Sequence, residues 1–146
     1  MWRKLLATPD DWLPMVARLG LGLVMFPHGA QKMLGWFGGY GFHATLQFFT
    51  GTMHLPLGLG VLAILAEFLG SIGLIAGFMG RVAAFGIGCN MVVAMLLVHH
   101  QFGFFMNWSG GQKGEGFEYH LLALTLVLIV LVRGSGKASL DRVLSA

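Results

Sequence analysis

Charge is what this sequence has least of. Only 10% of its 146 residues are charged, whereas 56% are hydrophobic. A soluble globular domain carries about 25% charged residues, so a chain this poor in charge cannot cover a surface that faces water. The composition therefore excludes a soluble domain and predicts an integral membrane protein in contact with the lipid bilayer. The length predicts a single transmembrane domain over residues 1–146.

Cysteine and the common cofactor motifs are nearly absent as well. The one cysteine, Cys89, excludes an intrachain disulfide and paired-thiol redox chemistry, and we expect it to be a small buried packing residue. No haem, flavin or iron–sulfur motif, phosphate-binding loop or Rossmann glycine pattern is evident. No tight metal-ligand spacing is present either, and the nine methionines fit apolar filling better than copper ligation. We therefore predict no metal site.

Long apolar runs make up most of the chain. They cover about residues 13–34, 55–79, 82–101 and 117–132. A membrane-spanning helix needs about 17 to 25 residues, so the last run is short and could begin a turn earlier. The runs are apolar at both odd and even positions, which favours helices over the strands of a membrane barrel. The sequence thus predicts an all-α bundle of four transmembrane helices, the first one retained rather than cleaved as a signal peptide. Residues 42–50 could add a short interfacial helix.

The basic residues lie at the ends of these runs rather than in one stripe, which argues against nucleic-acid binding. With four spans, one side of the membrane receives Arg3, Lys4, Arg18, Arg81, Arg133, Lys137 and Arg142. The other side holds only Lys32 and Lys113. Because Lys and Arg are enriched in the cytoplasmic segments of membrane proteins, we predict that both termini are cytoplasmic and that the protein lies in a bacterial inner membrane.

Glu67 is the strongest single indication of function. It is the only ionisable residue of the second run and lies near its middle. A carboxylate at that depth either stays protonated or pairs with a cation, for which Arg18 and His28 are the candidates. Such a pair could fix helix register or take part in a proton relay. Asn90 is expected to form an interhelical hydrogen bond, and Arg81 a structural contact at a tight turn.

A second group of polar residues gathers at the predicted outer ends of the helices. It comprises His28, Lys32, His99, Glu118, Tyr119 and His120. His28 and Lys32 are four residues apart and share a helix face, whereas at most one of His99 and His100 can face a common pocket. Histidine, carboxylate and tyrosine together can move protons near neutral pH. Alternatively, these are separate interfacial groups, with Lys32 extending to the membrane surface.

Several short segments resemble the DoxX family of small bacterial membrane proteins. They are Arg18-Leu19-Gly20-Leu21-Gly22-Leu23, Pro27-His28-Gly29-Ala30-Gln31-Lys32, Ala66-Glu67-Phe68-Leu69-Gly70, Gly80-Arg81-Val82-Ala83-Ala84, His99, Gly103-Phe104-Phe105, Gly116-Phe117-Glu118-Tyr119 and Ser139-Leu140-Asp141. The resemblance extends from about Arg18 to Asp141. It implies a four-helix membrane fold and an association with membrane redox chemistry, because relatives include a subunit of a thiosulfate:quinone oxidoreductase. The shared positions would be Arg18, His28, Lys32, Glu67, Arg81 and Glu118.

Three functions fit these observations. The first is a redox-associated subunit, for example of a quinone-linked oxidoreductase, with a quinone or small-molecule pocket near the outer leaflet. In it Glu67 and His28 would be catalytic, and electrons would come from a partner subunit or a small reductant. The second is a non-catalytic subunit that assembles or anchors a partner complex through its aromatic outer loops. The third is a transporter of a small solute or protons, which four short helices could form only as a homo-oligomer.

Overall fold

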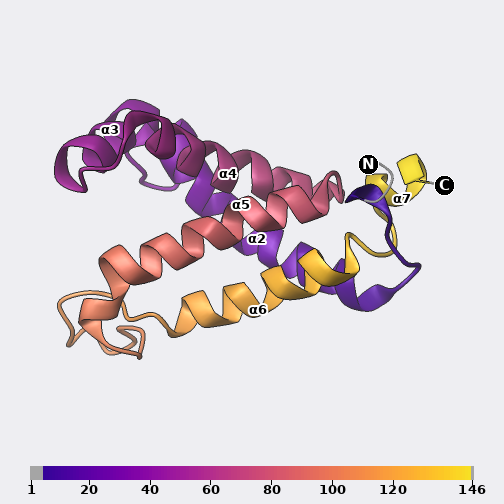
Figure 1. The fold of residues 1–146 in the computed structure, drawn as a ribbon. Coiled ribbons are helices and arrows are strands. Elements are labelled where there is room, and N and C mark those ends of the chain that lie inside the picture. The colour runs from indigo at the N-terminus through magenta and orange to yellow at the C-terminus, as the bar shows by residue number, and fades with distance from the viewer. Residues whose placement is uncertain (1–4, 146) are drawn as a thin grey trace.

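The computed structural model describes residues 5–145, so Arg3 and Lys4, which contribute to the predicted orientation, lie outside the described residues. The long helices are α2 (Trp12–Leu34), α4 (Leu57–Ala76), α5 (Gly80–Ala94) and α6 (Glu118–Arg133). They lie along one another in an elongated bundle (Figure 1). Both chain ends lie at one end of it, here called the terminal end. The opposite end, called the loop end, carries α3 and the 103–117 loop.

Shorter elements complete the loop end. They are α3 (Gly41–Gln47), the π-helix η1 (Phe48–Thr52), the π-helix η2 (Met95–His99) and the 3₁₀ turn η3 (His100–Phe102). The helix α5 runs directly into η2 and η3, so one continuous helical segment extends over 80–102. At the terminal end, α7 (Leu140–Ser145) follows α6. The helices α2 and α6 begin and end within one residue of the predicted runs 13–34 and 117–132. The helix α4 is shorter than the predicted 55–79, and α5 ends at Ala94, where the predicted helix to 101 continues as η2 and η3.

Three helical segments are long and apolar enough to cross a membrane: Trp12–Leu34, Leu57–Ala76 and Gly80–Phe102. This supports the prediction of an integral membrane protein. The fourth long helix, α6, has only 16 residues. The expectation for Cys89 was wrong, because its side chain is exposed on the outside of α5 rather than buried among the helices.

Glycines set how closely the helices pack. A Cβ atom added to Gly29 of α2 would lie 2.6 Å from Cα of Phe68, and one added to Gly22 would lie 3.0 Å from Cβ of Leu74. The backbones of α2 and α4 are therefore in contact, as small residues allow between helices in lipid. In the same way, Gly88 of α5 faces Val127 of α6, whose Cγ1 atom would lie 2.9 Å from an added Cβ.

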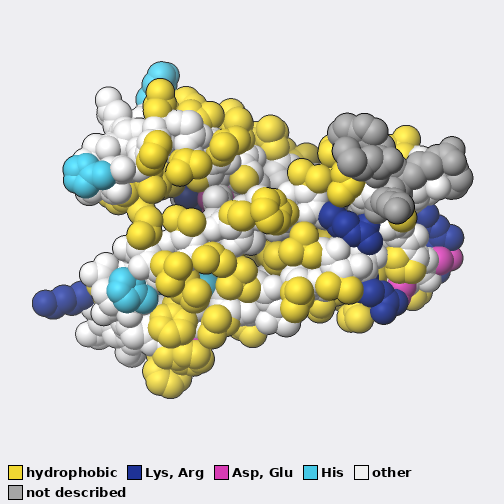
Figure 2. Space-filling view, in the orientation of Figure 1, with side chains coloured by type: hydrophobic (Ala, Val, Ile, Leu, Met, Phe, Trp, Pro, Cys, Tyr) yellow, Lys and Arg dark blue, Asp and Glu magenta, His cyan; other side chains and the backbone are white. Residues whose placement is uncertain are grey.

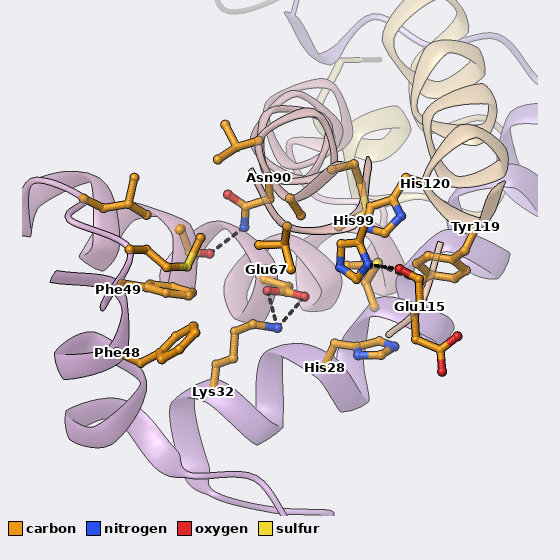
Figure 3. Close-up of a pocket in the computed structure, with 18 of the residues that line it drawn as sticks. His28, Lys32, Phe48, Phe49, Glu67, Asn90, His99, Glu115, Tyr119 and His120 are labelled. Atoms are coloured by element: carbon orange, nitrogen blue, oxygen red, sulfur yellow. Dashed lines mark hydrogen bonds and ion pairs between the residues drawn. The ribbon is translucent and has the colours of Figure 1, made fainter. Parts of the chain in front are cut away.

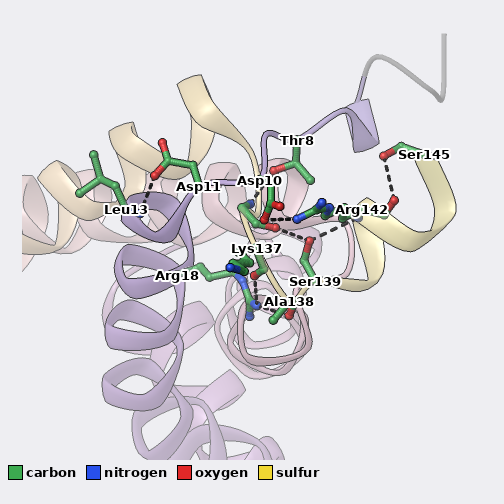
Figure 4. A network of polar contacts seen from close by, with 11 residues as sticks. Thr8, Asp10, Asp11, Leu13, Arg18, Lys137, Ala138, Ser139, Arg142 and Ser145 are labelled. Carbon is green, nitrogen blue, oxygen red and sulfur yellow. Dashed lines mark hydrogen bonds and ion pairs between the residues drawn. The ribbon is translucent and has the colours of Figure 1, made fainter.

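Arg18 is fully buried at the terminal end, where its guanidinium donates only to backbone carbonyls (Figure 4). Nη1 donates to the carbonyls of Leu74 (2.8 Å) and Ile75 (2.7 Å), which end α4, and Nε donates to Ser135 (2.8 Å). Nη2 donates to Ala138 (2.6 Å). Arg18 thus satisfies carbonyls that a helix end leaves without intrahelical partners. The prediction that it could pair with Glu67 was wrong, since α2 and α4 meet beside Glu67 at Gly29, about 16 Å along α2 from Arg18.

Two further charged side chains form hydrogen bonds that join segments at the terminal end. The carboxylate of Asp141 accepts from the backbone amides of Met79 (2.6 Å) and Gly80 (2.9 Å), and so caps the first turn of α5. Arg81 donates from Nε to the carbonyl of Leu131 near the end of α6 (3.0 Å), and from Nη1 to carbonyls of the segment before α2. The predicted structural role of Arg81 therefore corresponds to a contact between the α4–α5 turn and the last turn of α6.

Candidate functional site

A cavity of about 360 Å³ lies at the loop end, between the long helices and the short elements, and we call it the polar cavity. Figure 2 shows that this end of the molecule is forked, with a cleft between the part that carries α3 and the part that carries the 103–117 loop. The polar side chains within it (Figure 3) include His28, Lys32, Glu67, Asn90, His99 and His120. They come from all four long helices or from η2, the extension of α5. The bundle thus brings together residues far apart in sequence.

An ion pair between Lys32 and Glu67 forms part of the cavity wall. Nζ of Lys32 lies 2.9 Å from Oε2 of Glu67 and 3.0 Å from Oε1. The Glu67 side chain is only 7% exposed, and that of Lys32 is 28% exposed. The partner of Glu67 is therefore Lys32, whereas the sequence had suggested Arg18 or His28. The close approach at Gly29 places Glu67 beside the last turns of α2, within reach of the Lys32 ammonium.

Asn90 links the two neighbouring helices beside this pair. Its Nδ2 donates to the carbonyl of Ala63 on α4 (2.7 Å). This is the interhelical hydrogen bond that the sequence predicts, and it leaves the amide oxygen of Asn90 without a protein donor among the described hydrogen bonds. The cavity therefore offers an ammonium, a carboxylate and an amide within one apolar enclosure.

Imidazole and phenol rings gather on the other side of the cavity. The ring centroids of His99 and His120 are 4.3 Å apart, and those of His28 and Tyr119 are 6.2 Å apart. The Tyr119 hydroxyl lies 3.3 Å from Sδ of Met25. His99 lines the cavity, whereas the neighbouring His100 does not, because adjacent residues of a helix point in different directions. These rings can donate or accept hydrogen bonds and exchange protons.

His120 has an unusual environment. It is 4% exposed, and its Nδ1 is the only buried side-chain nitrogen or oxygen among residues 5–145 that has no hydrogen-bond partner. A buried polar atom without a partner costs about 1 to 3 kcal/mol, so such atoms are rare and often belong to functional sites. This atom belongs to a residue that lines the polar cavity, so the unpaired nitrogen adjoins the candidate site.

Glu118 does not line the polar cavity, so the prediction that it belongs to the pocket was wrong. Its Oε1 accepts from the backbone amide of Met106 (2.8 Å) and from Nε1 of Trp108 (3.0 Å). Glu118 is the first residue of α6, and there its carboxylate meets the donors of the folded loop before it. The sequence did not single out Glu115, which does line the cavity and whose carbonyl oxygen lies 2.8 Å from Nδ1 of His99.

Both π-helices also contribute to the cavity, through Phe48 and Phe49 of η1 and through Val98 and His99 of η2. Single π-turns occur often at functional sites, but no pattern in the sequence signals them here. A second cavity, of about 610 Å³, shares Lys32, Phe48 and Phe49 with the polar cavity, so these side chains form a common wall. Among residues 5–145, no three His, Cys, Asp or Glu side chains are arranged to hold a metal ion.

Comparison with known proteins identifies the family. The family model described as DoxX matches residues 13–100. The match includes Arg18, His28, Lys32, Glu67 and Arg81, while the resembling segments after residue 100 lie beyond it. No curated protein and no solved structure matches the chain. Because the matched region makes up more than half of the sequence, this membrane protein belongs to the DoxX family.

Proposed function

We propose that the polar cavity binds the head of a lipid-soluble ligand of the quinone class, and that the protein acts as a redox-associated membrane subunit. The observation that carries this proposal is the distribution of polarity in the cavity. Ionisable and aromatic polar groups lie inside it, whereas its opening is bordered by apolar side chains (Figure 2). A molecule with a compact polar ring and an apolar tail matches both parts.

The two sides of the opening come from different elements. Phe48, Phe49 and Met53 lie on or next to η1, and Val98 lies on η2. An apolar tail could leave between them toward lipid, because the outer surfaces of these elements are also hydrophobic. A cavity of this size falls within the range of small-molecule sites, which typically combine an apolar lining with a few polar groups.

The polar groups suit a ring with two opposed oxygen atoms. On one side, the Lys32 ammonium can donate to a carbonyl while remaining paired with Glu67. On the other, His28, Tyr119 and His120 supply rings that can donate or accept. Reduction of a quinone consumes two electrons and two protons; Glu67 and His28 are our candidates to relay these protons to and from the cavity. The electrons would come from a partner subunit or a small soluble reductant.

We also propose four membrane spans with both termini in the cytoplasm of a bacterium. The helix α6 packs along α2 and along the 80–102 segment, both of which are long enough to span, and the two aromatic segments both lie at the loop end. Lys and Arg side chains gather toward the terminal end in Figure 2. In a Cys89→Ser background, Lys113→Cys should react with an impermeant maleimide in intact cells, whereas Lys137→Cys should react only after lysis. The opposite labelling pattern would reverse the orientation.

Anchoring of a partner is the second candidate, favoured by the exposed aromatic residues of the loop end. Tyr40 and Trp108 are each 86% exposed, and Trp36 and Phe37 are more than half exposed. Such side chains also suit the headgroup region of a bilayer. Assembly would be lost on Trp36→Ala while ligand binding persisted, because Trp36 does not line the polar cavity; this outcome distinguishes anchoring from the quinone proposal. We do not propose transport, because Leu21 and Leu74 pack closely beneath the cavity.

Two neighbouring residues of η2 provide the test of ligand binding. Val98 lines the cavity, whereas Leu97 does not and is 52% exposed. Binding of heptyl-hydroxyquinoline N-oxide, a tailed quinol analogue, would be followed by its fluorescence in detergent micelles. We expect Val98→Phe to weaken binding at least about tenfold, equivalent to about 1.4 kcal/mol, and Leu97→Phe to leave it unchanged.

A reduced-minus-oxidised difference spectrum of protein purified with native lipids complements this titration. A quinone band in the wild type that is lost in Val98→Phe supports the proposal. If the analogue does not bind and the spectrum is flat, the quinone proposal is wrong. Equal binding by both variants would show that the analogue binds outside the polar cavity, and would contradict the assignment of the site.

A further inference from the structure

We infer that His99 is the residue that exchanges a proton with the ligand, and that the polar cavity therefore takes a hydroxyl-bearing ring, the reduced form of the quinone class, as well as the quinone. This inference rests on the proposed function. It is carried by the contact of His99 with the 103–117 loop and by the position of His120.

The contact of His99 with the loop fixes the protonation pattern of its ring. Nδ1 lies 2.8 Å from the backbone carbonyl oxygen of Glu115, as Figure 3 shows. A carbonyl oxygen only accepts hydrogen bonds, so Nδ1 must carry the hydrogen. In the neutral ring Nε2 is then a free acceptor on the opposite edge of the imidazole. The backbone contact thus fixes the tautomer, as a second hydrogen bond commonly does for functional histidines.

Hydrogen bonds within the 103–117 loop hold Glu115 in place. Backbone amides of Phe117 and Glu118 donate to the carbonyls of Gly103 (3.2 Å) and Phe104 (2.9 Å), which tie the two ends of the loop together. The side chain of Glu115 accepts from the amide of Asn107 (2.6 Å). The carbonyl opposite His99 therefore belongs to a folded loop with its own internal hydrogen bonds, and not to a free segment.

Titratable groups from three other elements line the cavity with His99. From α6, the His120 ring is 4.3 Å away between centroids, and Nδ1 of this ring has no protein partner. His28 and Lys32 of α2 and Glu67 of α4 line the same cavity, as do Tyr119 of α6 and Glu115 of the loop. Lys32 and Glu67 are paired to each other, and Nδ1 of His99 is held by the loop. Nε2 of His99 and the His120 ring therefore remain to bind a ligand oxygen.

The chemistry that follows is a proton exchange without electron transfer. Nε2 of neutral His99 accepts the hydrogen of a ring hydroxyl, and on full transfer the O–H bond breaks while an N–H bond forms. The products are an imidazolium and a ring oxyanion, to which His120 can donate a hydrogen bond. When His99 is protonated, Nε2 is a donor and favours a ring carbonyl instead. Histidine is suited to this change because its charge state switches within about pH 5 to 8.

The test uses two probes with opposite requirements. Heptyl-hydroxyquinoline N-oxide carries a hydroxyl, whereas a naphthoquinone with a short alkyl tail presents only carbonyls. On lowering the pH from about 8 to about 5, affinity of the wild type should fall for the hydroxyl probe and rise for the quinone, each about tenfold. Subtracting the profile of His99→Gln removes the titration of the probes themselves, because glutamine does not ionise.

The variants are chosen to separate His99 from its surroundings. We expect His99→Gln to bind both probes and to show only the pH dependence that comes from titration of the probes themselves. The reason is that the glutamine amide can donate and accept hydrogen bonds at any pH. The matched control is His100→Gln, whose side chain does not line the cavity; it should keep both wild-type profiles. Circular dichroism of each variant confirms that the helices are intact.

The outcomes distinguish this inference from the function on which it rests. If neither probe binds the wild type, the proposed function fails and the inference with it. If both probes bind but His99→Gln keeps the wild-type pH profiles, His99 does not exchange the proton, while the ligand site stands. Loss of the profiles in His100→Gln would equally overturn the assignment. Opposite slopes that disappear only in His99→Gln support it.

Discussion

Lys32 of α2 and Glu67 of α4 form an ion pair in which Nζ lies within 3.0 Å of both carboxylate oxygens. The contact forms where Gly29 allows the two helices to touch. Glu67 is almost completely buried, so its charge would have little access to water without the ammonium. The pair therefore has two roles in our interpretation: it joins the helices, and it keeps two charges at the cavity wall.

Replacing only one residue of this ion pair should destabilise the bundle. Lys32→Met leaves the Glu67 carboxylate buried without a cation, and we expect the free energy of unfolding to fall by about 3 kcal/mol. In the double variant Lys32→Met/Glu67→Leu, both charges are gone, and stability should return to within about 1 kcal/mol of the wild type. Unfolding by SDS in mixed micelles measures both. Additive losses in the double variant would show that the two side chains do not interact.

A second prediction concerns the cap of α5 at the terminal end. Asp141 accepts from two backbone amides and from the Ser135 hydroxyl (2.5 Å). Asp141→Asn turns one acceptor oxygen into a donor that faces these donors, so unfolding free energy should fall by about 2 kcal/mol.

Asp10→Asn is the matched control for this cap. Asp10 is exposed and pairs with Arg142, whose hydrogen bond lowers the pKa of the Asp10 carboxyl (Figure 4). An exposed pair contributes little, so Asp10→Asn should change the unfolding curve hardly at all. Equal effects of the two substitutions would contradict a specific capping role for Asp141.

Much of the fold could be predicted from the lengths of the apolar runs, because a helix in lipid pairs its backbone amides and carbonyls within the same segment. The ion-pair partner of Glu67 could not be predicted from the sequence. Spacing within one helix says which residues share a face, but the level at which two helices meet depends on contacts such as Gly29 with Phe68. Arg18 and Lys32 lie on similar faces of α2, and only the interhelical register decides between them.

Only some residues of the candidate site could be predicted from the sequence. Polar residues in apolar runs pointed to His28 and His99, both of which line the cavity. Glu118 carries the same kind of signal, yet it holds the loop, because at a helix start a carboxylate can equally meet nearby amides. Beyond Met95 the π-turn of η2 also inserts an extra residue per turn, so faces estimated from regular α-helical spacing no longer apply.

Glycine substitutions in α2 test the helix contact directly. A Cβ at Gly29 would lie 2.6 Å from the Phe68 backbone, so Gly29→Ala must push α2 and α4 apart and should cost about 1 to 3 kcal/mol of stability. Gly20 has nothing within 4 Å of an added Cβ. Gly20→Ala should therefore stabilise the helix, by about 0.5 to 1 kcal/mol. SDS titration of both variants measures the difference, and similar curves would mean that α2 and α4 do not touch at Gly29.

The last prediction links Glu118 to the protonation state of His99. The Glu118 carboxylate holds Met106 and Trp108, and hydrogen bonds to a charged group contribute about 1.5 to 3 kcal/mol each. Glu118→Ala should therefore open the 103–117 loop more often and speed tryptic cleavage after Lys113, its only Lys or Arg, by about tenfold.

The same opening should remove the Glu115 carbonyl from His99, so that the ring is no longer held as one tautomer. Glu118→Ala would then weaken the pH dependence of probe binding without removing any group that lines the cavity. Glu118→Gln is the matched variant, because it keeps one acceptor oxygen and should lie between the wild type and alanine in both assays. Fast cleavage with an unchanged pH profile would show that His99 keeps its tautomer without the loop, and that the cavity rather than the loop orients its ring.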